Sequence, residues 1–223
     1  MSPVARTRKA ARQTGRKLLE HDRALGFRYV AGADEAGRGC LAGPLVAAAV
    51  LLDLERLTES DEQGLLTLDD SKRQSESERA ALYPLIMRSA ARVTIISRSA
   101  KEIDRLGLHK SNLELLGRAL ATVARPGCIC LSDGFEVAEL AYEQRGLIKG
   151  DATSAAIAAA SVIAKETRDR YMRRAAGHYP GWGFERHVGY ASAEHRSAIE
   201  RLGITPLHRL SFRSTAYQQL KLD

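Results

Sequence analysis

Short apolar runs that favour β-strands alternate along this chain with segments of helical pattern. The strand-like runs lie at 29–34, 45–52, 92–98, 128–133 and 146–149. Helical segments are expected between and after them, at 75–90, 101–106, 111–124, 136–143 and 151–176, with one or two short helices near the C-terminus. Strands that alternate with helices in this way predict an α/β domain built on one sheet.

Two sites in the sequence carry specific signals for the start of a helix, and one long stretch carries no helix signal. Ser75 and Glu78 form a capping box that predicts a helix start, although Pro84 interrupts the pattern that follows. Asp151 precedes an alanine-rich stretch and is expected to begin a long helix. The charged and small residues at 53–71 predict a loop.

The size and composition of the chain suit one globular domain. The 223 residues, 44% of them apolar, suffice to bury a core without disulfide staples. Three cysteines do not make a disulfide framework and suggest a reducing, cytoplasmic environment, with Cys128 and Cys130 expected as ordinary strand residues. The longest apolar run, 41–52, is too short to span a bilayer, and no membrane association is expected.

The charge is distributed unevenly. The formal net charge is +7, but residues 1–28 carry 8 basic and 2 acidic side chains, whereas residues 29–164 carry 15 and 19. We expect residues 1–28 to form a basic, flexible or weakly helical arm and residues 29–223 to form the folded domain. The pattern suits a cleft for a polyanion with metal ions at its centre. It equally suits a disordered basic tail next to solvated helices.

Four acids fall where strands end or a helix begins. Asp34 and Glu35 end the first strand, Asp133 ends a later strand, and Asp151 precedes the long helix. Strand ends in an α/β sheet converge on a crevice. Carboxylates gathered there would repel each other unless cations bind between them, and hard oxygen ligands suit Mg²⁺ or Mn²⁺.

Each acid also has an ordinary explanation. Asp133 with Gly134 is a common turn dipeptide, and Asp151 alone could be a helix N-cap. Asp34 and Glu35 could be a solvated pair in a loop. Spacing alone leaves these alternatives open.

The glycine-rich turn at 37–43 follows the first strand. Its spacing, G-x-G-x-x-x-G, and the apolar run after Pro44 exclude a dinucleotide-binding turn, and it is no Walker-type loop either. Glycines on both sides of Arg38 would instead let the backbone approach a ligand closely, with a guanidinium beside it.

The helix after Asp151 carries a polar stripe. Ser154, Ser161, Lys165 and Arg168 share one face at helical spacing. This stripe could follow a phosphate backbone, or it could be a solvated helix face.

Ordered motifs over residues 29–214 resemble ribonuclease HII. The motifs are Tyr29-Val-Ala-Gly-Ala-Asp-Glu-Ala-Gly-Arg-Gly39, Leu41-Ala-Gly-Pro44, Asp69-Asp-Ser-Lys72, Leu131-Ser-Asp-Gly134, Lys149-Gly-Asp151, Ala158-Ala-Ala-Ser-Val-Ile-Ala-Lys165, His187-Val-Gly-Tyr190 and His208-Arg-Leu-Ser-Phe212. The resemblance implies an RNase H-like fold, with a five-stranded mixed sheet flanked by helices and a helical C-terminal part. It also implies a monomeric endonuclease that cleaves the RNA strand of RNA–DNA hybrids and cuts 5′ of ribonucleotides embedded in duplex DNA.

The resemblance assigns roles to individual residues. Asp34, Glu35, Asp133 and Asp151 would bind divalent metal, Mg²⁺ or Mn²⁺, and carry catalysis. The residues expected to contact substrate are Gly37, Arg38, Gly39, Lys72, Ser161, Lys165 and Tyr190. In this interpretation the Gly-Arg-Gly backbone and Tyr190 sense the ribose 2′-hydroxyl, the group that separates RNA from DNA. Two alternatives remain: a module that grips hybrids without cutting them, and a DNA-specific nuclease with the same fold.

Overall fold

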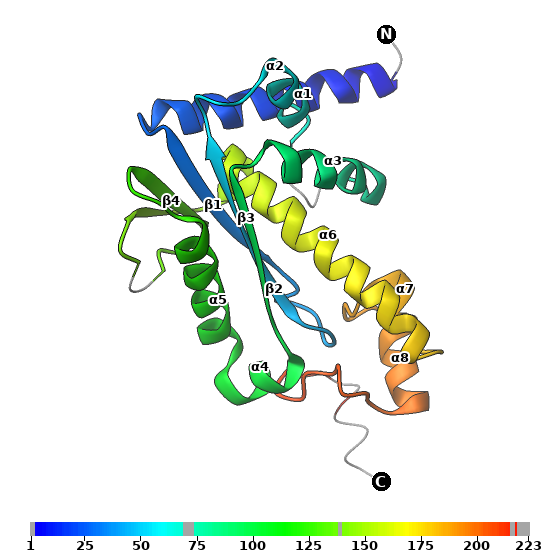
Figure 1. The fold of residues 1–223 in the computed structure, drawn as a ribbon. Helices are drawn as coiled ribbons and strands as arrows, with labels where there is room; N and C mark the ends of the chain where they lie inside the picture. Colours follow the sequence, from blue (N-terminus) through cyan, green and yellow to red (C-terminus); the bar gives the residue numbers. More distant parts are fainter. Residues whose placement is uncertain (1–2, 69–73, 138–139, 215–216, 218–223) are drawn as a thin grey trace.

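A single five-stranded sheet forms the centre of the molecule (Figure 1). The computed structural model describes residues 3–68, 74–137, 140–214 and 217. The strands are β1 (Tyr29–Ala36), β2 (Leu45–Asp53), β3 (Arg92–Arg98), β4 (Cys128–Asp133) and β5 (Glu143–Leu147). Their spatial order is β3-β2-β1-β4-β5, with β1 antiparallel to β2 and parallel to β4. The mixed sheet expected from the family resemblance is confirmed.

Helices cover both faces of this sheet. The α-helices are α1 (Pro3–Ala24), α2 (Glu59–Leu65), α3 (Glu76–Ser89), α4 (Ala100–Leu106), α5 (Leu108–Val123), α6 (Ala155–His178), α7 (Phe184–His187) and α8 (Ala193–Leu202). The long helix α6 packs on β1 and β2 with α1 and α3 beside it, whereas α5 packs on the opposite face (Figure 1). The helix predicted from the capping box at Ser75 is confirmed.

Strand β1 supplies side chains to both cores. Val30 and Ala36 lie in the core under α6, whereas Ala31 and Ala33 lie in the core under α5. Successive strand residues point to opposite faces, so Asp34 belongs to the α6 side and Glu35 to the α5 side. Gly32 faces α6, where a Cβ would lie 2.2 Å from the carbonyl carbon of Ala156. Glycine therefore lets the start of α6 approach the strand.

The N-terminal segment, expected to be a flexible or weakly helical arm, is helical, but its C-terminal part packs against the domain. Residues 3–24 form the helix α1, and Leu18 and Leu19 are buried in the core under α6. Asp22 is also buried, and its Oδ2 accepts a hydrogen bond from the backbone N–H of Ala156 at 2.9 Å. The C-terminal part of α1 is therefore docked on the sheet domain, because it caps the first turn of α6 and fills part of its core.

Two local predictions are wrong. Of the segment expected to be a helix at 136–143, residues 138 and 139 lie outside the described residues, and the other residues up to 142 are not helical. The last residue, Glu143, begins β5, which pairs with β4 from Ile129↔Glu143 to Asp133↔Leu147. The strand expected at 146–149 thus begins earlier, at Glu143, because pairing with β4 starts there. The loop expected at 53–71 contains the helix α2, which begins with a capping box at Thr58.

The C-terminal region returns to the turn after β1. Isolated β-bridges join Cys40 to Tyr190 and Ala42 to His208. Residues about 150 positions apart are thus brought together beside the glycine-rich turn. None of the described helices has the length and apolar character needed to cross a membrane.

Candidate active site

The ends of β1 and β4 bring two of the expected acids side by side. The parallel pairing of these strands runs up to Ala33 opposite Ser132, so Asp34 and Asp133 are the next residues in register. Parallel strands end at the same edge of a sheet, which is why acids placed at both ends converge.

Asp34 is a buried carboxyl group on the α6 side. It is 5% exposed, and it accepts hydrogen bonds from the side chain of Ser161 and from the backbone N–H of Glu35, the latter at 2.7 Å. Burial raises the pKa of Asp34 well above its usual value, and the charges of Glu35 and Asp133 raise it further, against the hydrogen bond from Ser161. This site therefore favours either a proton or a cation at Asp34.

Glu35 faces the other side of the sheet. It forms an ion pair with Arg38, with Nη1 3.2 Å from Oε1, and a hydrogen bond with the side chain of Asn112 on α5. Burial raises the pKa of Glu35, Arg38 opposes that shift, and the charge of Asp133 adds to it. The second carboxylate oxygen, Oε2, is buried and has no hydrogen-bond partner in the described part of the chain. It is available to a ligand that carries positive charge.

Asp133 connects the strand end to the turn that carries Asp151. Its Oδ1 accepts a hydrogen bond from the backbone N–H of Gly150 at 2.7 Å. Asp151 is the next residue, lies in a 3-10 turn (Gly150–Ala152) and is 4% exposed. The helix α6 begins after this turn with Ser154 as its N-cap, so the helix start expected at Asp151 lies a few residues later.

The donor set fits divalent cations. Across residues 3–68, 74–137, 140–214 and 217, no three or more His, Cys, Asp or Glu side chains are arranged as a ready-made metal site. Asp34, Glu35 and Asp133 nevertheless lie close enough that neighbouring charge raises the pKa values of Asp34 and Glu35, and one oxygen of Glu35 has no hydrogen-bond partner in the described chain. Asp151 is placed near them through Gly150, which bonds Asp133. Mutual repulsion and an unpaired buried oxygen are what a bound cation would relieve.

The glycine-rich turn and Tyr190 lie together. Gly37 has a φ of 96°, a region that favours glycine, and Arg38 and Gly39 are exposed. Tyr190 is 42% exposed and connected to Cys40 by a β-bridge. The Nζ of Lys165 lies 5.0 Å from the Tyr190 ring centroid, within the range of a cation–π contact.

The polar stripe of α6 is neither solvated nor free to contact phosphate along its length. Ser154, Ser161 and Arg168 are buried, and Arg168 donates to backbone carbonyls. Lys165 is partly exposed and pairs with Asp169 at 2.9 Å. Lys72, the remaining expected substrate contact, lies outside the described residues.

Sequence reasoning missed two residues of this region, Asn112 and Arg209, and interpreted a third, Arg168, as part of a stripe that follows phosphate or faces solvent. Asn112, which is 1% exposed, bonds Glu35, and the buried Arg168 and Arg209 hold the backbone of the glycine-rich turn. A polar residue on the apolar face of a helix is a signal that could have singled out Asn112. The two arginines resemble surface cations in sequence, and nothing local shows their burial.

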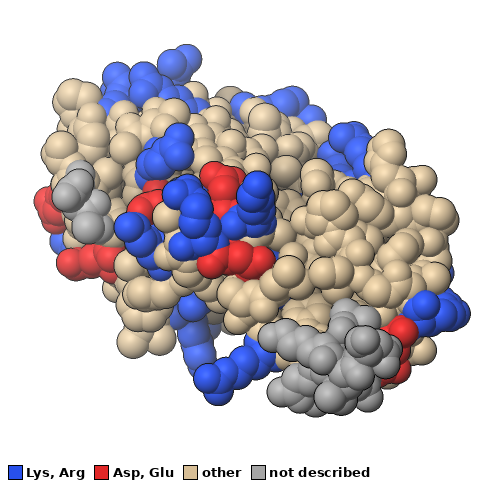
Figure 2. All heavy atoms as spheres, turned by 90° about the horizontal axis from the view of Figure 1, so that it is seen from below, with Lys and Arg blue, Asp and Glu red and all other residues tan. Residues whose placement is uncertain are grey.

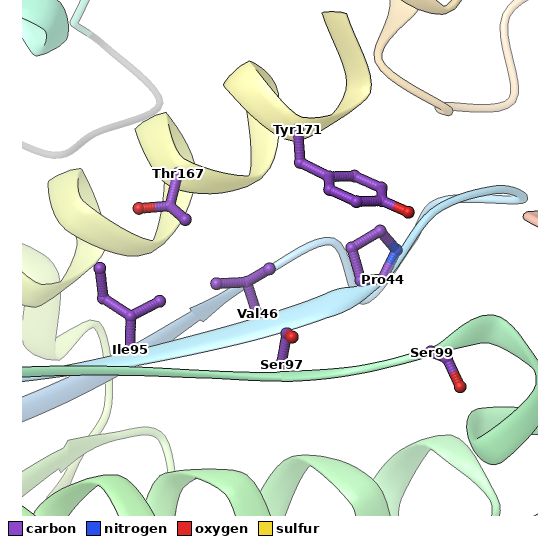
Figure 3. Close-up of a pocket in the computed structure, with 7 residues that line it drawn as sticks. All are labelled: Pro44, Val46, Ile95, Ser97, Ser99, Thr167 and Tyr171. Carbon is purple, nitrogen blue, oxygen red and sulfur yellow. The ribbon is translucent and has the colours of Figure 1, made fainter. Parts of the chain in front are cut away.

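One hollow of the described structure is lined by none of the four acids. It holds about 230 Å³ between α6 and strands β2 and β3, and its lining includes Val46, Ile95 and Tyr171 but no charged side chain (Figure 3). On the face seen in Figure 2, Lys and Arg side chains gather beside Asp and Glu side chains, and much of the rest carries no charge. Neither feature competes with the acid cluster as a catalytic site.

Comparison with known proteins places the chain in one family. The family model for ribonuclease HII matches residues 31–215. The chain is 47% identical over 192 residues to ribonuclease HII of Rhizobium leguminosarum bv. trifolii, covering 86% of this chain and 80% of that protein. It is also 47% identical over 189 residues to ribonuclease HII of Brucella suis, covering 84% and 83%.

Solved structures of related ribonucleases have the same fold as this chain. The crystal structure of ribonuclease H2 from Pyrococcus horikoshii matches with a TM-score of 0.72 and 25% identity, over 87% of this chain and 97% of that one. A structure of the PCNA:RNase HII complex from Archaeoglobus fulgidus matches with a TM-score of 0.65 and 27% identity, over 81% and 92%. Bst-RNase HIII in complex with Mn²⁺ shares the fold, with a TM-score of 0.70 at 20% identity over 91% and 72%. The chain therefore belongs to the ribonuclease HII family, whose members are endonucleases that hydrolyse RNA in RNA–DNA hybrids.

Proposed function

We propose that this enzyme, besides cutting the RNA strand of hybrids, incises duplex DNA 5′ of single embedded ribonucleotides and leaves 5′-phosphate and 3′-hydroxyl ends. The observation that carries the proposal is that a cluster of acids lies next to a turn with exposed backbone. The acids at the ends of β1 and β4 adjoin a turn of exposed, glycine-flanked backbone that is bridged to Tyr190.

The four acids have separate tasks in this proposal. Asp34, Glu35 and Asp133 are the core ligands for Mg²⁺ or Mn²⁺, and Asp151 completes the set from the turn before α6. Two bound divalent ions would supply an activated water and stabilisation of the departing 3′ oxygen. The chain's own contribution is to hold the carboxylates. Asp34 is oriented by the side chain of Ser161 and by the backbone N–H of Glu35. Glu35 is oriented by Asn112 and Arg38. Asp133 is oriented by the backbone N–H of Gly150.

Recognition of the ribose falls to the backbone of Gly37, Arg38 and Gly39 together with Tyr190. Backbone groups of Arg38 and Gly39 can reach the sugar because both residues are exposed and no atom lies within 4 Å of a Cβ placed on Gly39. Gly37 itself is buried against Arg168. The exposed ring of Tyr190 offers a stacking surface and a hydroxyl at the same place. Lys165, which is partly exposed beside Tyr190, is the remaining residue that we propose as a phosphate contact. Ser161, expected as a further contact, is buried and bonded to Asp34, so its proposed task is to orient that carboxylate. We also propose that the enzyme acts as a monomer.

Two rival functions make different predictions. A module that only binds hybrids gains nothing from a carboxylate cluster whose members raise each other's pKa. A DNA-specific nuclease has no use for a 2′-hydroxyl sensor.

One assay separates the three functions. Three duplexes of the same sequence (all DNA, DNA with one ribonucleotide, and an RNA–DNA hybrid) are incubated with the protein and Mg²⁺ or Mn²⁺. The proposal expects cutting of the second and third duplexes only. Equal cutting of the all-DNA duplex would contradict ribonucleotide recognition, and binding of the hybrid without cutting would favour the module.

A further inference from the structure

Arg209 is a buried cation that bonds backbone carbonyls of the glycine-rich turn. Its side chain is fully buried. The Nη1 donates to the carbonyl oxygens of Gly37 and Arg38 at 2.6 and 3.2 Å, and the Nε donates to that of Gly43 at 3.0 Å. One guanidinium therefore ties both ends of the turn together.

Arg168 also bonds the same turn, from helix α6. From the middle of α6 it donates to the carbonyls of Pro44 and Ala42, at 3.0 and 2.9 Å, and to that of Val188 at 2.9 Å. Val188 has a φ of 42°, which a β-branched residue rarely adopts, and it lies two residues before Tyr190. Arg168 thus fixes the turn and the tyrosine segment relative to each other.

The glycines of the turn make room for Arg168. A Cβ on Gly37 would lie 2.2 Å from the Nε of Arg168, and a Cβ on Gly43 would lie 3.0 Å from its Nη2. Glycine at these positions therefore serves the packing of the arginine as well as any approach of a ligand.

These cations are held mainly by backbone carbonyls, although the charge of Asp104 acts on Arg209 from nearby. Neither Arg168 nor Arg209 forms an ion pair with a carboxylate of the described chain, and one nitrogen of Arg209, Nη2, has no hydrogen-bond partner there. Burial and the nearby charge of Arg168 lower the pKa of Arg209 to about 10. Two buried like charges are costly for a fold, and such costs concentrate at functional sites.

The direction of the bonded carbonyls sets the direction of the neighbouring N–H groups. In a trans peptide the C=O and the N–H point in opposite directions, and no described peptide bond is cis. Because the carbonyls of Gly37 and Arg38 point inward to Arg209, the N–H groups of Arg38 and Gly39 point away from it, and both residues are exposed.

We infer that Arg209 and Arg168 are positioning residues that preorganise the Gly37–Pro44 turn and Tyr190, and so set the preference for a ribonucleotide over a deoxyribonucleotide. The inference rests on the proposed function, because it concerns the same turn. It predicts that the forked geometry of arginine is needed and that positive charge alone does not suffice, since a lysine ammonium cannot bond three separate carbonyls from one planar group.

The test compares Arg209→Lys and Arg168→Lys with a matched control, Arg92→Lys. Arg92 also donates to a backbone carbonyl, that of Ala124 at 3.3 Å, but it lies at the start of β3 away from the turn. Dissociation constants are measured with Ca²⁺ for two duplexes of one sequence, all DNA and DNA with one ribonucleotide. Amide hydrogen exchange is followed over residues 40–43, where the N–H groups of Ala42 and Gly43 bond Gly189 and Leu207.

We expect each variant of the two arginines to lose about tenfold or more of the preference for the ribonucleotide duplex, the scale on which removal of a charged hydrogen bond acts. Exchange at 40–43 should become faster, whereas Arg92→Lys should match the wild type in both measurements. A uniform loss of affinity for both duplexes, or an unchanged preference, would overturn the inference.

Two further outcomes are separable. If the wild type binds both duplexes equally, the proposed ribonucleotide recognition is wrong, and unchanged exchange at 40–43 in Arg209→Lys would then overturn the positioning role as well. If the lysine variants do not fold, Asp104→Asn replaces them. Asp104 holds the backbone N–H groups of Leu210 and Ser211, next to Arg209, at 2.9 and 3.0 Å. If Asp104→Asn folds, shows faster exchange at 40–43 and still prefers the ribonucleotide duplex as strongly as the wild type does, the turn does not set that preference and the inference is wrong.

Discussion

The carboxylate of Asp133 accepts a hydrogen bond from the backbone N–H of Gly150 at 2.7 Å. This contact joins the end of β4 to the turn that carries Asp151, and it leads directly into α6. Asp34 adjoins Asp133 through the sheet register and also bonds Ser161 of α6. The acids are therefore held by the sheet, by the turn and by one helix, so a change at any one acid can be tested against the others.

Replacement of Asp34 should remove activity and spare binding. Asp34→Asn keeps the shape but removes a carboxylate that we assign to the metal site. Cleavage of an RNA–DNA hybrid should fall by more than about 100-fold, the scale on which a single electrostatic group acts in catalysis. Affinity for the hybrid should change little, because phosphate contacts dominate it.

The matched control for this variant is Asp53→Asn. Asp53 is also a buried aspartate of the sheet, 7% exposed, but it pairs with Arg28 outside the acid cluster. Its loss should lower stability and leave turnover per folded molecule unchanged. Retained activity in Asp34→Asn would exclude Asp34 from the metal site.

Tyr190→Ala should affect single-ribonucleotide substrates most. A long hybrid offers many contacts, whereas one embedded ribonucleotide depends on recognition at a single sugar. We expect kcat/KM to fall roughly tenfold more on the embedded ribonucleotide, which is the scale of one base–aromatic stacking interaction. Tyr171→Ala is the control, since Tyr171 is 45% exposed on α6 compared with 42% for Tyr190. Equal losses on both substrates would argue against junction sensing.

Removal of residues 1–12 should weaken binding without changing the chemical step. This stretch carries 4 basic and no acidic side chains, and it ends before the buried Leu18, Leu19 and Asp22 that anchor α1. The plot of log affinity against log salt should become shallower by up to about 0.9 for each phosphate that the truncated protein no longer neutralises. An unchanged slope in fluorescence titrations at several salt concentrations would show that these cations do not contact DNA.

Two buried histidines should make the protein sensitive to mild acid. His195 and His208 share a hydrogen bond at 3.2 Å between their Nε2 atoms, and burial lowers the pKa of each to about 4. A histidine whose folded-state pKa is depressed stabilises the fold fully above its unfolded-state pKa of about 6.5. That stability is lost as the pH falls from about 6.5 towards 4.

Urea unfolding at pH 7 and pH 5 measures this effect. The two histidines should contribute a loss on the order of a few kcal/mol between these values, which the raised pKa values of Asp34 and Glu35 oppose in the wild type and in the variants alike. His208→Gln should lose less, because it removes one of the two groups that must take up a proton. The exposed His178→Gln should follow the wild type. Equal pH dependence in His208→Gln would contradict the assignment.

The sequence predicted most of the sheet and brought the acids to its edge. Strand patterns at 92–98 and 128–133 coincide with β3 and β4, because their apolar runs are bounded by clear turn residues. The position of Asp34 and Asp133 at one edge of the sheet could be predicted because the local sequence pattern shows where their strands end. The metal-binding roles of the four acids remain predictions.

The errors share a physical cause, which is dependence on distant partners. Burial of Leu18 and Asp22 depends on α6, more than 130 residues away, so α1 could not be identified as docked from its basic composition. Strand β5 begins at Glu143 because its residues pair with β4, and no local pattern shows that pairing. Arg168 has the spacing of a surface cation, yet its partners are carbonyls of a turn 124 residues earlier.

The most direct test of the central claim is to map the ends produced from a duplex with one embedded ribonucleotide and Mg²⁺ or Mn²⁺. Hydrolysis by water held at the acid cluster should break the linkage on the 5′ side of the ribonucleotide. The ribonucleotide fragment should then carry a 5′-phosphate, and the upstream fragment a 3′-hydroxyl. A cut on the 3′ side that leaves a 2′,3′-cyclic phosphate would show attack by the ribose itself and would contradict the account.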